Sequence, residues 1–432
     1  MHYPSKSSRR ETIWWLSSLS ICFLGLLRII NLGQGTTFFF DEWNFLLDRN
    51  QVTISNLLQN HNGHLSVIPV AIYQFLLKSF GAGTYFPYRL MTAMLNSAIA
   101  LVVGLVVRRR SADIYALCAV ALIAFMGAGW QNWLWAFQIG MMLSVLSGLS
   151  AVLLVGRAAG KSHERLIVAL LVVSVCSSGV GIAVLFGVAL AALAEGRKSL
   201  LLRSLLVFLG YGVWSLKYGE SQVKLNNLSL LPSYVAQSAE AVFGGIGGWT
   251  LAIGGVLAGM TVVFSVRSLR SRAGRSPEAI ALASICLCGW ILSGLSRAQF
   301  GEPGASRYVH VGICWIVPLI GLLLGTETRR SRPTQILAII AVLVAIVGSW
   351  DIATRAGHEF RERSTIVRAE LTALSHIRSS VDVSYQPDPV RAPQITFGRF
   401  QKFAIHHDVP VLSVDKLSDL AVGVRQEIDR VF

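Results

Sequence analysis

Two adjacent carboxylic acids, Asp41 and Glu42, follow a run of phenylalanines directly after the first long apolar stretch of the chain. An ionised side chain near a bilayer is costly unless it has partners or water, by about 2.5–3.5 kcal/mol at the bilayer centre, so such residues indicate function. Adjacent side chains of an extended segment point to opposite sides. The pair is therefore a poor match for two carboxylates that face each other across one bond, and we expect one general base with one supporting acid. The alternative is that both acids stabilise the N-terminus of a helix at 42–50, an effect worth about 0.3–1 kcal/mol.

Two histidines, His61 and His64, lie further along the same polar stretch, on either side of Gly63. On a helix their spacing would place both on one face, but the glycine favours a turn. Three roles are weighed: hydrogen bonding to a phosphate or a sugar, a structural role in the loop, and metal ligation together with Asp41 or Glu42. Hydrogen bonding is favoured, and no cysteine or histidine spacing typical of a zinc site is present. We therefore expect no metal or other cofactor, with a divalent cation as the alternative.

A set of basic residues falls on the same side of the expected topology as these groups. Its members are Arg49, Lys78, Arg89, Lys217, Lys224, Arg297 and Arg307. Arg297 and Arg307 bracket a short loop that contains Gln299, and Tyr308 follows directly. Converging arginines suit a phosphate-bearing ligand, because a guanidinium binds phosphate through two parallel hydrogen bonds. The candidate binding residues are thus His61, His64, Arg89, Arg297, Gln299, Arg307 and Tyr308, whereas Lys78 and Lys224 suit lipid headgroups.

These residues are embedded in a strongly apolar chain. Of its 432 residues, 53% are hydrophobic and 14% are charged, and the mean hydropathy is +0.57. Ordinary globular chains carry about 25% charged residues. The apolar residues fall in long blocks such as 111–130, 279–295 and 335–350, and a helix needs about 17–25 such residues to cross a bilayer core. We expect an all-α polytopic membrane protein.

The charge distribution sets the expected orientation. The formal net charge is +15, and residues from Asp351 onward add nothing to it, because eleven basic and eleven acidic side chains cancel there. The excess lies in short clusters between apolar blocks, which is typical of cytoplasmic loops. The clusters are Lys6/Arg9/Arg10, Arg108–Arg110, Arg157/Lys161/Arg165, Arg197/Lys198/Arg203, Arg267/Arg270/Arg272/Arg275 and Arg329/Arg330/Arg332. A nucleic-acid partner would require a continuous basic face, so we expect none.

Blocks and clusters together predict eleven membrane spans, with the N-terminus in the cytoplasm and the C-terminus outside. The spans are expected at 12–32, 86–107, 113–130, 136–156, twice within 166–193, and at 199–216, 240–266, 279–296, 308–325 and 334–350. The two short spans within 166–193 meet at an external glycine-rich break, 177–181; a single tilted helix is the alternative. External loops are expected at 33–85, with an interfacial helix at 65–80, and at 217–234.

The spans define a membrane domain, residues 1–350, and residues 351–432 form a small external region. In that region, residues 356–378 have helical periodicity and residues 409–414 suggest a short strand. All the candidate site residues fall on the external side of this topology. The sequence therefore predicts chemistry on the outer face of a cell membrane, the plasma or inner membrane.

The layout resembles the multi-spanning glycosyltransferases of the GT-C fold, the bacterial relatives of protein O-mannosyltransferases. The likeness is carried by Asp41-Glu42 in an external loop after the first span, Arg89 at the start of the second, the break Ser178-Gly179-Val180-Gly181, and Arg307-Tyr308 at a late span. It extends in architecture over residues 12–350. Two departures are the absence of a lysine that the family often has at the glycine break, and the small size of the external region.

The resemblance implies a polyprenyl-phosphate sugar as donor, a glycan, lipid or protein as acceptor, and contact with membrane lipids. Asp41 would be the general base that deprotonates the acceptor hydroxyl, and Glu42 would assist or orient it. Arg89, Arg297 and Arg307 would stabilise the departing lipid phosphate. Two other functions are weighed: a transporter or flippase of a lipid-linked saccharide, disfavoured because no repeated halves are found, and a non-catalytic partner in envelope polysaccharide assembly.

Overall fold

The computed structural model of the protein describes residues 6–157, 160–248, 253–256, 258–259, 276–324, 332–376 and 381–413. Helices dominate these residues, and seven helical segments are long and apolar enough to cross a membrane, by length and composition. They belong to α1 (Lys6–Leu32), α5 (Phe86–Arg108), α8 (Ile139–Val155), α11 (Lys198–Tyr218), α14 (Pro277–Arg297), α15 (Ser306–Leu324) and α16 (Arg332–His376). Shorter helices complete the bundle: α4 (Val67–Phe80), α6 (Asp113–Phe125), α7 (Trp130–Leu134), α9 (Lys161–Val175), α10 (Val180–Ala194) and α12 (Leu231–Gly247).

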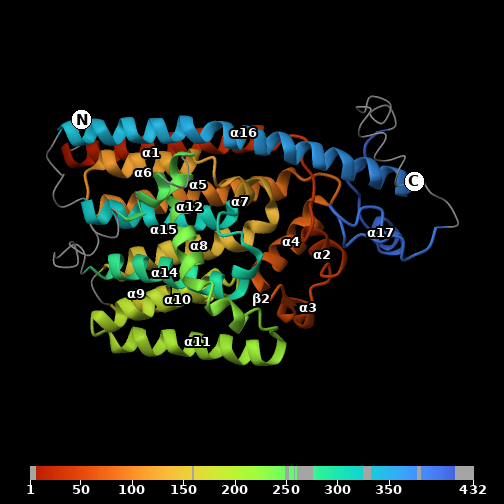
Figure 1. The fold of residues 1–432 in the computed structure, drawn as a ribbon, viewed down its shortest axis with the longest axis horizontal. Coiled ribbons are helices and arrows are strands. Elements are labelled where there is room, and N and C mark those ends of the chain that lie inside the picture. Colours follow the sequence, from red (N-terminus) through yellow and green to blue (C-terminus); the bar gives the residue numbers. More distant parts are fainter. Residues whose placement is uncertain are drawn as a thin grey trace, which may run out of the picture.

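The long helices lie side by side along the longest axis of the molecule (Figure 1). Ion pairs join their basic ends: Arg108 with Glu11 at 2.9 Å, Arg109 with Glu278 at 3.0 Å, and Arg197 with Glu164 at 3.5 Å. We call this the basic end. The short elements α2 (Glu42–Leu47), α3 (Ile54–Leu58), β1 (Asn60–His61), β2 (His64–Leu65) and α17 (Phe397–Ala404) gather at the opposite end, the loop end.

The apolar block at 166–193 forms two helices, α9 and α10, as predicted, and the alternative of a single tilted helix is wrong. The chain turns between them, and Gly181 packs so closely on α9 that an added Cβ would lie 2.5 Å from the Ser174 carbonyl oxygen. Glu164, near the start of α9, contacts Arg197, just after α10. The two helices are therefore antiparallel, with both far ends at the basic end.

The predicted span 113–130 is interrupted, because α6 stops at Phe125 and α7 begins at Trp130. Arg28 of α1 donates a hydrogen bond of 2.9 Å to the Phe125 carbonyl, and a cation favours a helix C-terminus. Beyond it, the Gly127 amide donates to Ser349 Oγ of α16. The helix thus ends where a half-buried arginine binds its last carbonyl, and a distant helix binds the chain just beyond it.

The predicted span 240–266 is also divided. Helix α12 begins earlier, at Leu231, and its C-cap Gly248 has φ +66°, a left-handed conformation that ends helices. Gly254 then approaches the Glu240 carbonyl oxygen so closely that an added Cβ would lie 2.2 Å from it. Gly254 therefore packs on α12, and residues 249–252, 257 and 260–266 of the predicted span lie outside the described residues.

Helix α16 runs without a break across the predicted domain boundary at 350/351 and ends at His376. Residues 356–376 are helical, as their periodicity predicts. The only glycine in this stretch is Gly357, which packs against the Leu32 carbonyl, where an added Cβ would lie 3.0 Å from the oxygen. The first part of the predicted external region is thus a direct extension of a membrane-length helix.

The strand suggested at 409–414 is wrong for its described residues, 409–413, which carry no strand. This segment lies along α16: Arg368 donates to the Val411 carbonyl at 3.2 Å, and the Leu412 amide donates to Thr372 Oγ1 at 2.8 Å. Its backbone groups are satisfied by helix side chains, so a sheet partner is not needed.

Candidate functional site

Asp41 lies at the start of α2, yet its carboxylate does not cap this helix. Instead, Asp41 Oδ2 accepts a hydrogen bond of 3.2 Å from Asn62 Nδ2, and Oδ1 accepts one of 3.5 Å from Gln394 Nε2. The residue before it, Phe40, has φ +50°, which is rare for a residue with a Cβ. The loop therefore presents the carboxylate to side chains from distant parts of the chain, although both acids do lie at the N-terminus of a helix, as the alternative expected.

Burial raises the pKa of Asp41 above its ordinary value of 3.8. The hydrogen bond from Asn62 opposes this rise, and so do the positive charges of Arg307 and Arg297. A carboxylate with a raised pKa is a stronger base than one in free solution. Asp41 therefore has the properties of a general base.

Glu42 faces away from this site and has no exposed surface. Its carboxyl oxygens accept hydrogen bonds from Tyr73 Oη at 2.5 Å, from Tyr85 Oη at 2.9 Å and from the Phe39 amide at 2.8 Å. Burial raises the pKa of Glu42 to about 8, and these donors oppose the rise. Glu42 ties the loop to α4 and to the residue before α5, so its contribution to the site is positional.

His61 and His64 flank a two-residue hairpin turn and pair with each other across it. The turn residues Asn62 and Gly63 have φ values of +51° and +79°, the conformation that Asn-Gly favours in tight hairpins. His61 packs between Phe45 and other aromatic rings. Burial lowers the pKa of both histidines to about 4, so the rings are neutral at pH 7. The same turn thus positions both imidazoles and the amide that holds Asp41.

His64 lies against the glycine-rich break between α9 and α10. A Cβ added to Gly179 would lie 2.6 Å from His64 Nδ1, so only glycine leaves room for this ring. The positive charge of Arg297 contributes to the low pKa of His64. The predicted break and the predicted histidine therefore meet at the loop end.

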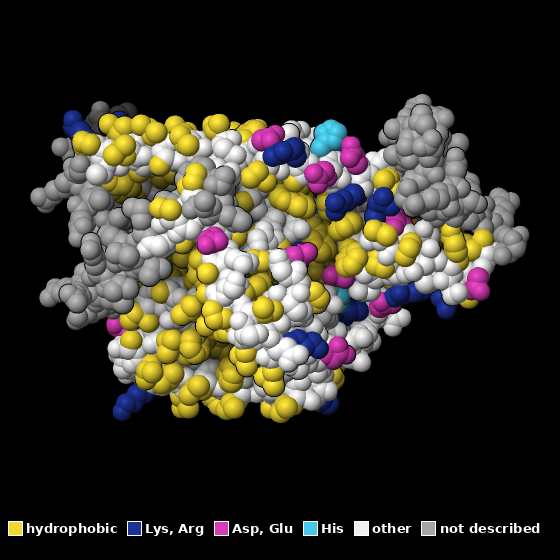
Figure 2. All heavy atoms as spheres, in the orientation of Figure 1, with side chains coloured by type: hydrophobic (Ala, Val, Ile, Leu, Met, Phe, Trp, Pro, Cys, Tyr) yellow, Lys and Arg dark blue, Asp and Glu magenta, His cyan; other side chains and the backbone are white. Residues whose placement is uncertain are grey.

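Two arginines border a hollow of about 240 Å³ at the loop end. Arg297 ends α14 and Arg307 lies in the first turn of α15, and their guanidinium carbons lie 5.8 Å and 4.8 Å from the centre of the Tyr308 ring. The other lining residues are Phe300 and Glu302. We call this space the arginine hollow. In Figure 2, acidic and basic side chains gather over this half of the molecule, whereas hydrophobic side chains dominate the long helices.

Arg307 is held in place by Gln131, next to the start of α7. Gln131 Oε1 accepts from the Arg307 backbone amide at 3.2 Å and from Arg307 Nη1 at 3.3 Å. Among the described residues, the Arg297 guanidinium forms no hydrogen bond or ion pair, although Glu302 lines the same hollow. The two cations thus retain donors for an anionic ligand that enters the arginine hollow.

Three other predicted cationic or polar residues lie outside this group. Arg89 packs under Gly33 and donates to Thr36 Oγ1 at 3.1 Å, so it supports the loop from below. Gln299 is exposed and its carbonyl oxygen accepts from Asn227. Arg49 donates to the Gln59 carbonyl at 3.1 Å, at the end of α3.

Three site residues escaped the sequence analysis: Asn62, Gln131 and Gln394. The Asn62-Gly63 pair is a strong hairpin signal, so the position of Asn62 was accessible from the sequence. Gln131 and Gln394 carry no such signal, because their partners are far away in the chain.

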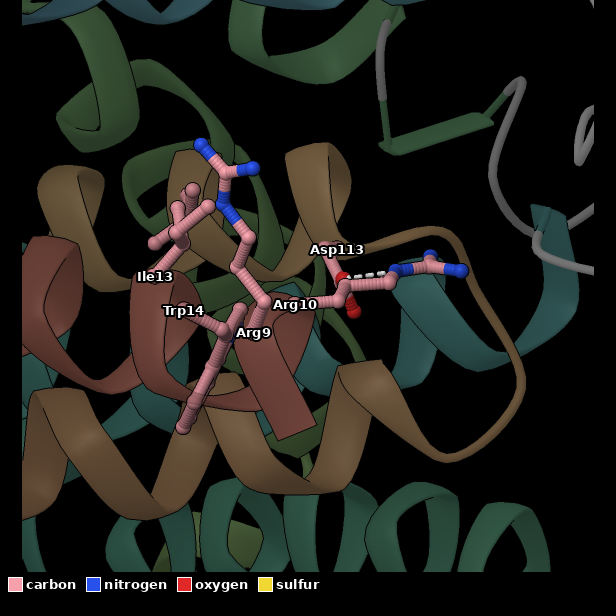
Figure 3. A pocket seen from close by; sticks show the side chains of 6 residues that line it. Arg9, Arg10, Ile13, Trp14 and Asp113 are labelled. Atoms are coloured by element: carbon pink, nitrogen blue, oxygen red, sulfur yellow. Dashed lines mark hydrogen bonds and ion pairs between the residues drawn. The ribbon is translucent and has the colours of Figure 1, made fainter. Parts of the chain in front are cut away.

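A second hollow, of about 250 Å³, lies at the basic end (Figure 3). Arg9, Ile13 and Trp14 of α1 line it, and Arg10 points to Asp113 with an ion pair of 2.6 Å. Among the described residues that line this hollow, the one carboxylate, Asp113, is paired with Arg10 and Arg108, and Ile13, Trp14 and Leu117 are apolar. No group of three or more metal-ligating side chains that could hold a metal ion occurs within the described parts of the chain.

Comparison with protein-family models finds no match for this chain, and comparison with curated proteins finds none either. What the site can do therefore follows from its own residues and their geometry. It combines a half-buried carboxylate, two neutral imidazoles and two cations beside a hollow, at the end of a bundle of membrane-length helices.

Proposed function

We propose that the protein is a membrane glycosyltransferase that transfers a sugar from a polyprenyl-phosphate donor to an acceptor hydroxyl. The observation that carries the proposal is a half-buried carboxylate, Asp41, within electrostatic reach of Arg297 and Arg307, the two arginines that line the arginine hollow. A base and a phosphate-binding pair at the end of a membrane bundle fit a reaction in which the leaving group is a lipid phosphate.

The chemistry needs only one carboxylate. Asp41 would take the proton of the acceptor hydroxyl as its oxygen forms a bond to the anomeric carbon. The bond from that carbon to the phosphate oxygen breaks, and the phosphate leaves with the electron pair and without a proton. Arg297 and Arg307 would stabilise the charge that develops on it. The neutral imidazoles of His61 and His64 would donate hydrogen bonds to sugar or phosphate oxygens.

The proposal includes an orientation and a number of crossings. The loop end lies outside and the basic end in the cytoplasm, because lysine and arginine resist translocation. Ten crossings would be made by α1, α5, α6 with α7, α8, α9, α10, α11, α14, α15 and α16. The eleventh would be the predicted span at 240–266, part of which lies outside the described residues.

The test is sugar transfer by Asp41→Asn in reconstituted vesicles. Donors are undecaprenyl phosphates that carry labelled mannose, glucose, galactose or arabinose, and the acceptors are those in a membrane extract. Removal of a general base is expected to lower the rate by a factor of about 10²–10⁴. Asp351→Asn is the matched control, because Asp351 is 71% exposed and pairs only with Arg355 on the surface.

Full activity of Asp41→Asn would exclude Asp41 as the base. Movement of the labelled lipid across the bilayer without a new glycosidic product would instead establish a transporter. No donor turnover and no binding of undecaprenyl phosphate by the wild type would establish a non-catalytic partner.

A further inference from the structure

We infer that the chain beyond α16 is part of the site: residues 391–399, which we name the clamp, fix the Asp41 loop, and Gln394 is the residue that positions the Asp41 carboxylate. The contacts between the clamp and the loop do not depend on any reaction, whereas the effect of Gln394 on catalysis rests on the proposed function. The sequence separates the partners by more than three hundred positions, and the fold brings them into contact.

The clamp contacts the loop on both sides of Asp41. Before it, the Phe40 amide donates to the Arg391 carbonyl at 3.2 Å. At Asp41 itself, Gln394 Nε2 donates to Oδ1 at 3.5 Å. After it, Arg399 forms an ion pair with Asp48, the C-cap of α2. The segment that carries Asp41 is therefore held at three points by one stretch of chain.

The clamp is itself a folded unit. Arg399 Nη1 donates to the Gln394 carbonyl at 2.7 Å, which ties the turn to α17. Helix α17 begins at the N-cap Thr396 and buries Phe397, Phe400 and Phe403. Because these rings are buried in the core, they hold the clamp in place, and the clamp in turn holds Gln394 in a fixed position.

Helix α16 supports the loop from a second direction. Ser364 Oγ accepts from the Thr37 amide at 3.0 Å, and Arg361 Nε donates to the Gln34 carbonyl at 2.8 Å. The Phe39 ring packs edge-on against Phe360 at 5.4 Å. The part of α16 beyond residue 350 thus packs directly against the loop and holds it rigidly from that side.

The backbone of the loop shows why such support is needed. Phe40 has φ +50°, and a residue with a Cβ persists in that region only where its surroundings over-determine it. The Phe40 amide is the group that the clamp binds. Release of the clamp would let Phe40 return to a common conformation, which would redirect the adjacent Asp41 carboxylate.

The first test measures hydrogen exchange in the full-length protein in nanodiscs and needs no substrate. The double variant Gln394→Ala/Arg399→Ala removes the side-chain anchors of the clamp. Its matched control is Gln401→Ala/Lys402→Ala, two exposed positions of α17. A peptide that covers residues 37–41 should exchange roughly tenfold faster in the clamp variant than in the control. Equal exchange in both variants would overturn the clamp.

The second test separates positioning from stability. Gln394→Glu keeps the shape of the side chain and places a second carboxylate beside Asp41, which raises the pKa of Asp41. The acid limb of the transfer rate, measured with the undecaprenyl-phosphate sugars above, should move up by about one pH unit, while Gln401→Glu should leave it in place. An unmoved acid limb would overturn the role of Gln394. If the wild type transfers no sugar, the exchange experiment still decides the clamp, so failure of the proposed function is distinguishable.

Discussion

The buried carboxyl of Glu42 should make the stability of the protein depend on pH in a way that Glu42→Gln abolishes. Glu42 has no exposed surface, and burial raises its pKa to about 8 from an ordinary 4.5. Between these values the folded state holds a proton that the unfolded state releases. The free energy of unfolding therefore falls as pH rises from about 4.5 through 8, and the loss is complete above the folded-state pKa.

The size of the effect follows from this interval. Each pKa unit corresponds to about 1.4 kcal/mol, so between pH 5 and pH 9 the Glu42 contribution to the free energy of unfolding falls by about 4 kcal/mol. Glutamine cannot titrate. It does meet a hydrogen-bond conflict, because three donors, from Tyr73, Tyr85 and the Phe39 amide, converge on the carboxyl oxygens. That conflict costs about 1–3 kcal/mol at every pH.

The difference in the free energy of unfolding between the wild type and Glu42→Gln should therefore change sign between pH 5 and pH 9. We expect Glu42→Gln to be less stable than the wild type at pH 5 and more stable at pH 9. With an unfolding entropy of about 2.1 cal/mol/K per residue, the relative shift in Tm over this range is roughly 4 °C. The assay is thermal unfolding in one detergent, or in nanodiscs, at five pH values, with the exposed Glu359→Gln as control.

Only the difference between wild type and variant is informative. His61 and His64 have pKa values lowered to about 4, so each stabilises the fold above its unfolded value near 6.5, a contribution that is lost as pH falls toward 4. The histidines contribute this opposite trend equally to the wild type and to Glu42→Gln, so it cancels in the difference between their Tm values. A Tm difference that stays constant from pH 5 to pH 9 would refute the reasoning, because it would mean that the three donors keep Glu42 in one protonation state throughout.

Three further outcomes are expected. Gly179→Ala should displace the His64 ring, because the new Cβ would lie 2.6 Å from Nδ1. Sugar transfer should then fall at least tenfold while expression is unchanged. The control Gly210→Ala, where the added Cβ meets open space, should leave sugar transfer unchanged. Arg307→Ala should weaken binding of undecaprenyl phosphate, measured by its thermal stabilisation of the protein, by about 2–3 kcal/mol. Arg28→Ala should lower stability by about 2 kcal/mol at neutral pH, because the end of α6 loses its charged donor, and equal Tm values would contradict that role.

The sequence alone determined the all-α character of the chain and the positions of most of its long apolar helices. These properties are sums over consecutive residues: hydropathy adds along a span, and basic clusters mark span ends. The Asn62-Gly63 turn and the break before Val180 are local in the same sense, since glycine permits backbone conformations that its neighbours then follow. Sequence reasoning also separated the directions of Asp41 and Glu42, but its premise of an extended segment is wrong, because Asp41 has φ −58° and ψ −15° and is the N-cap residue of α2.

Only the tertiary structure decided where α6 ends, which acid is buried and what holds the other. Arg28 and Ser349 terminate α6 from distant helices. Two tyrosines from other elements enclose Glu42, while Gln394 and Asn62 hold Asp41. Such contacts depend on the packing of all the helices at once, and no local property of glutamine at position 394 predicts its partner. Asp41 was recognisable from its residue type and its place after a membrane helix, but its surroundings came from the fold.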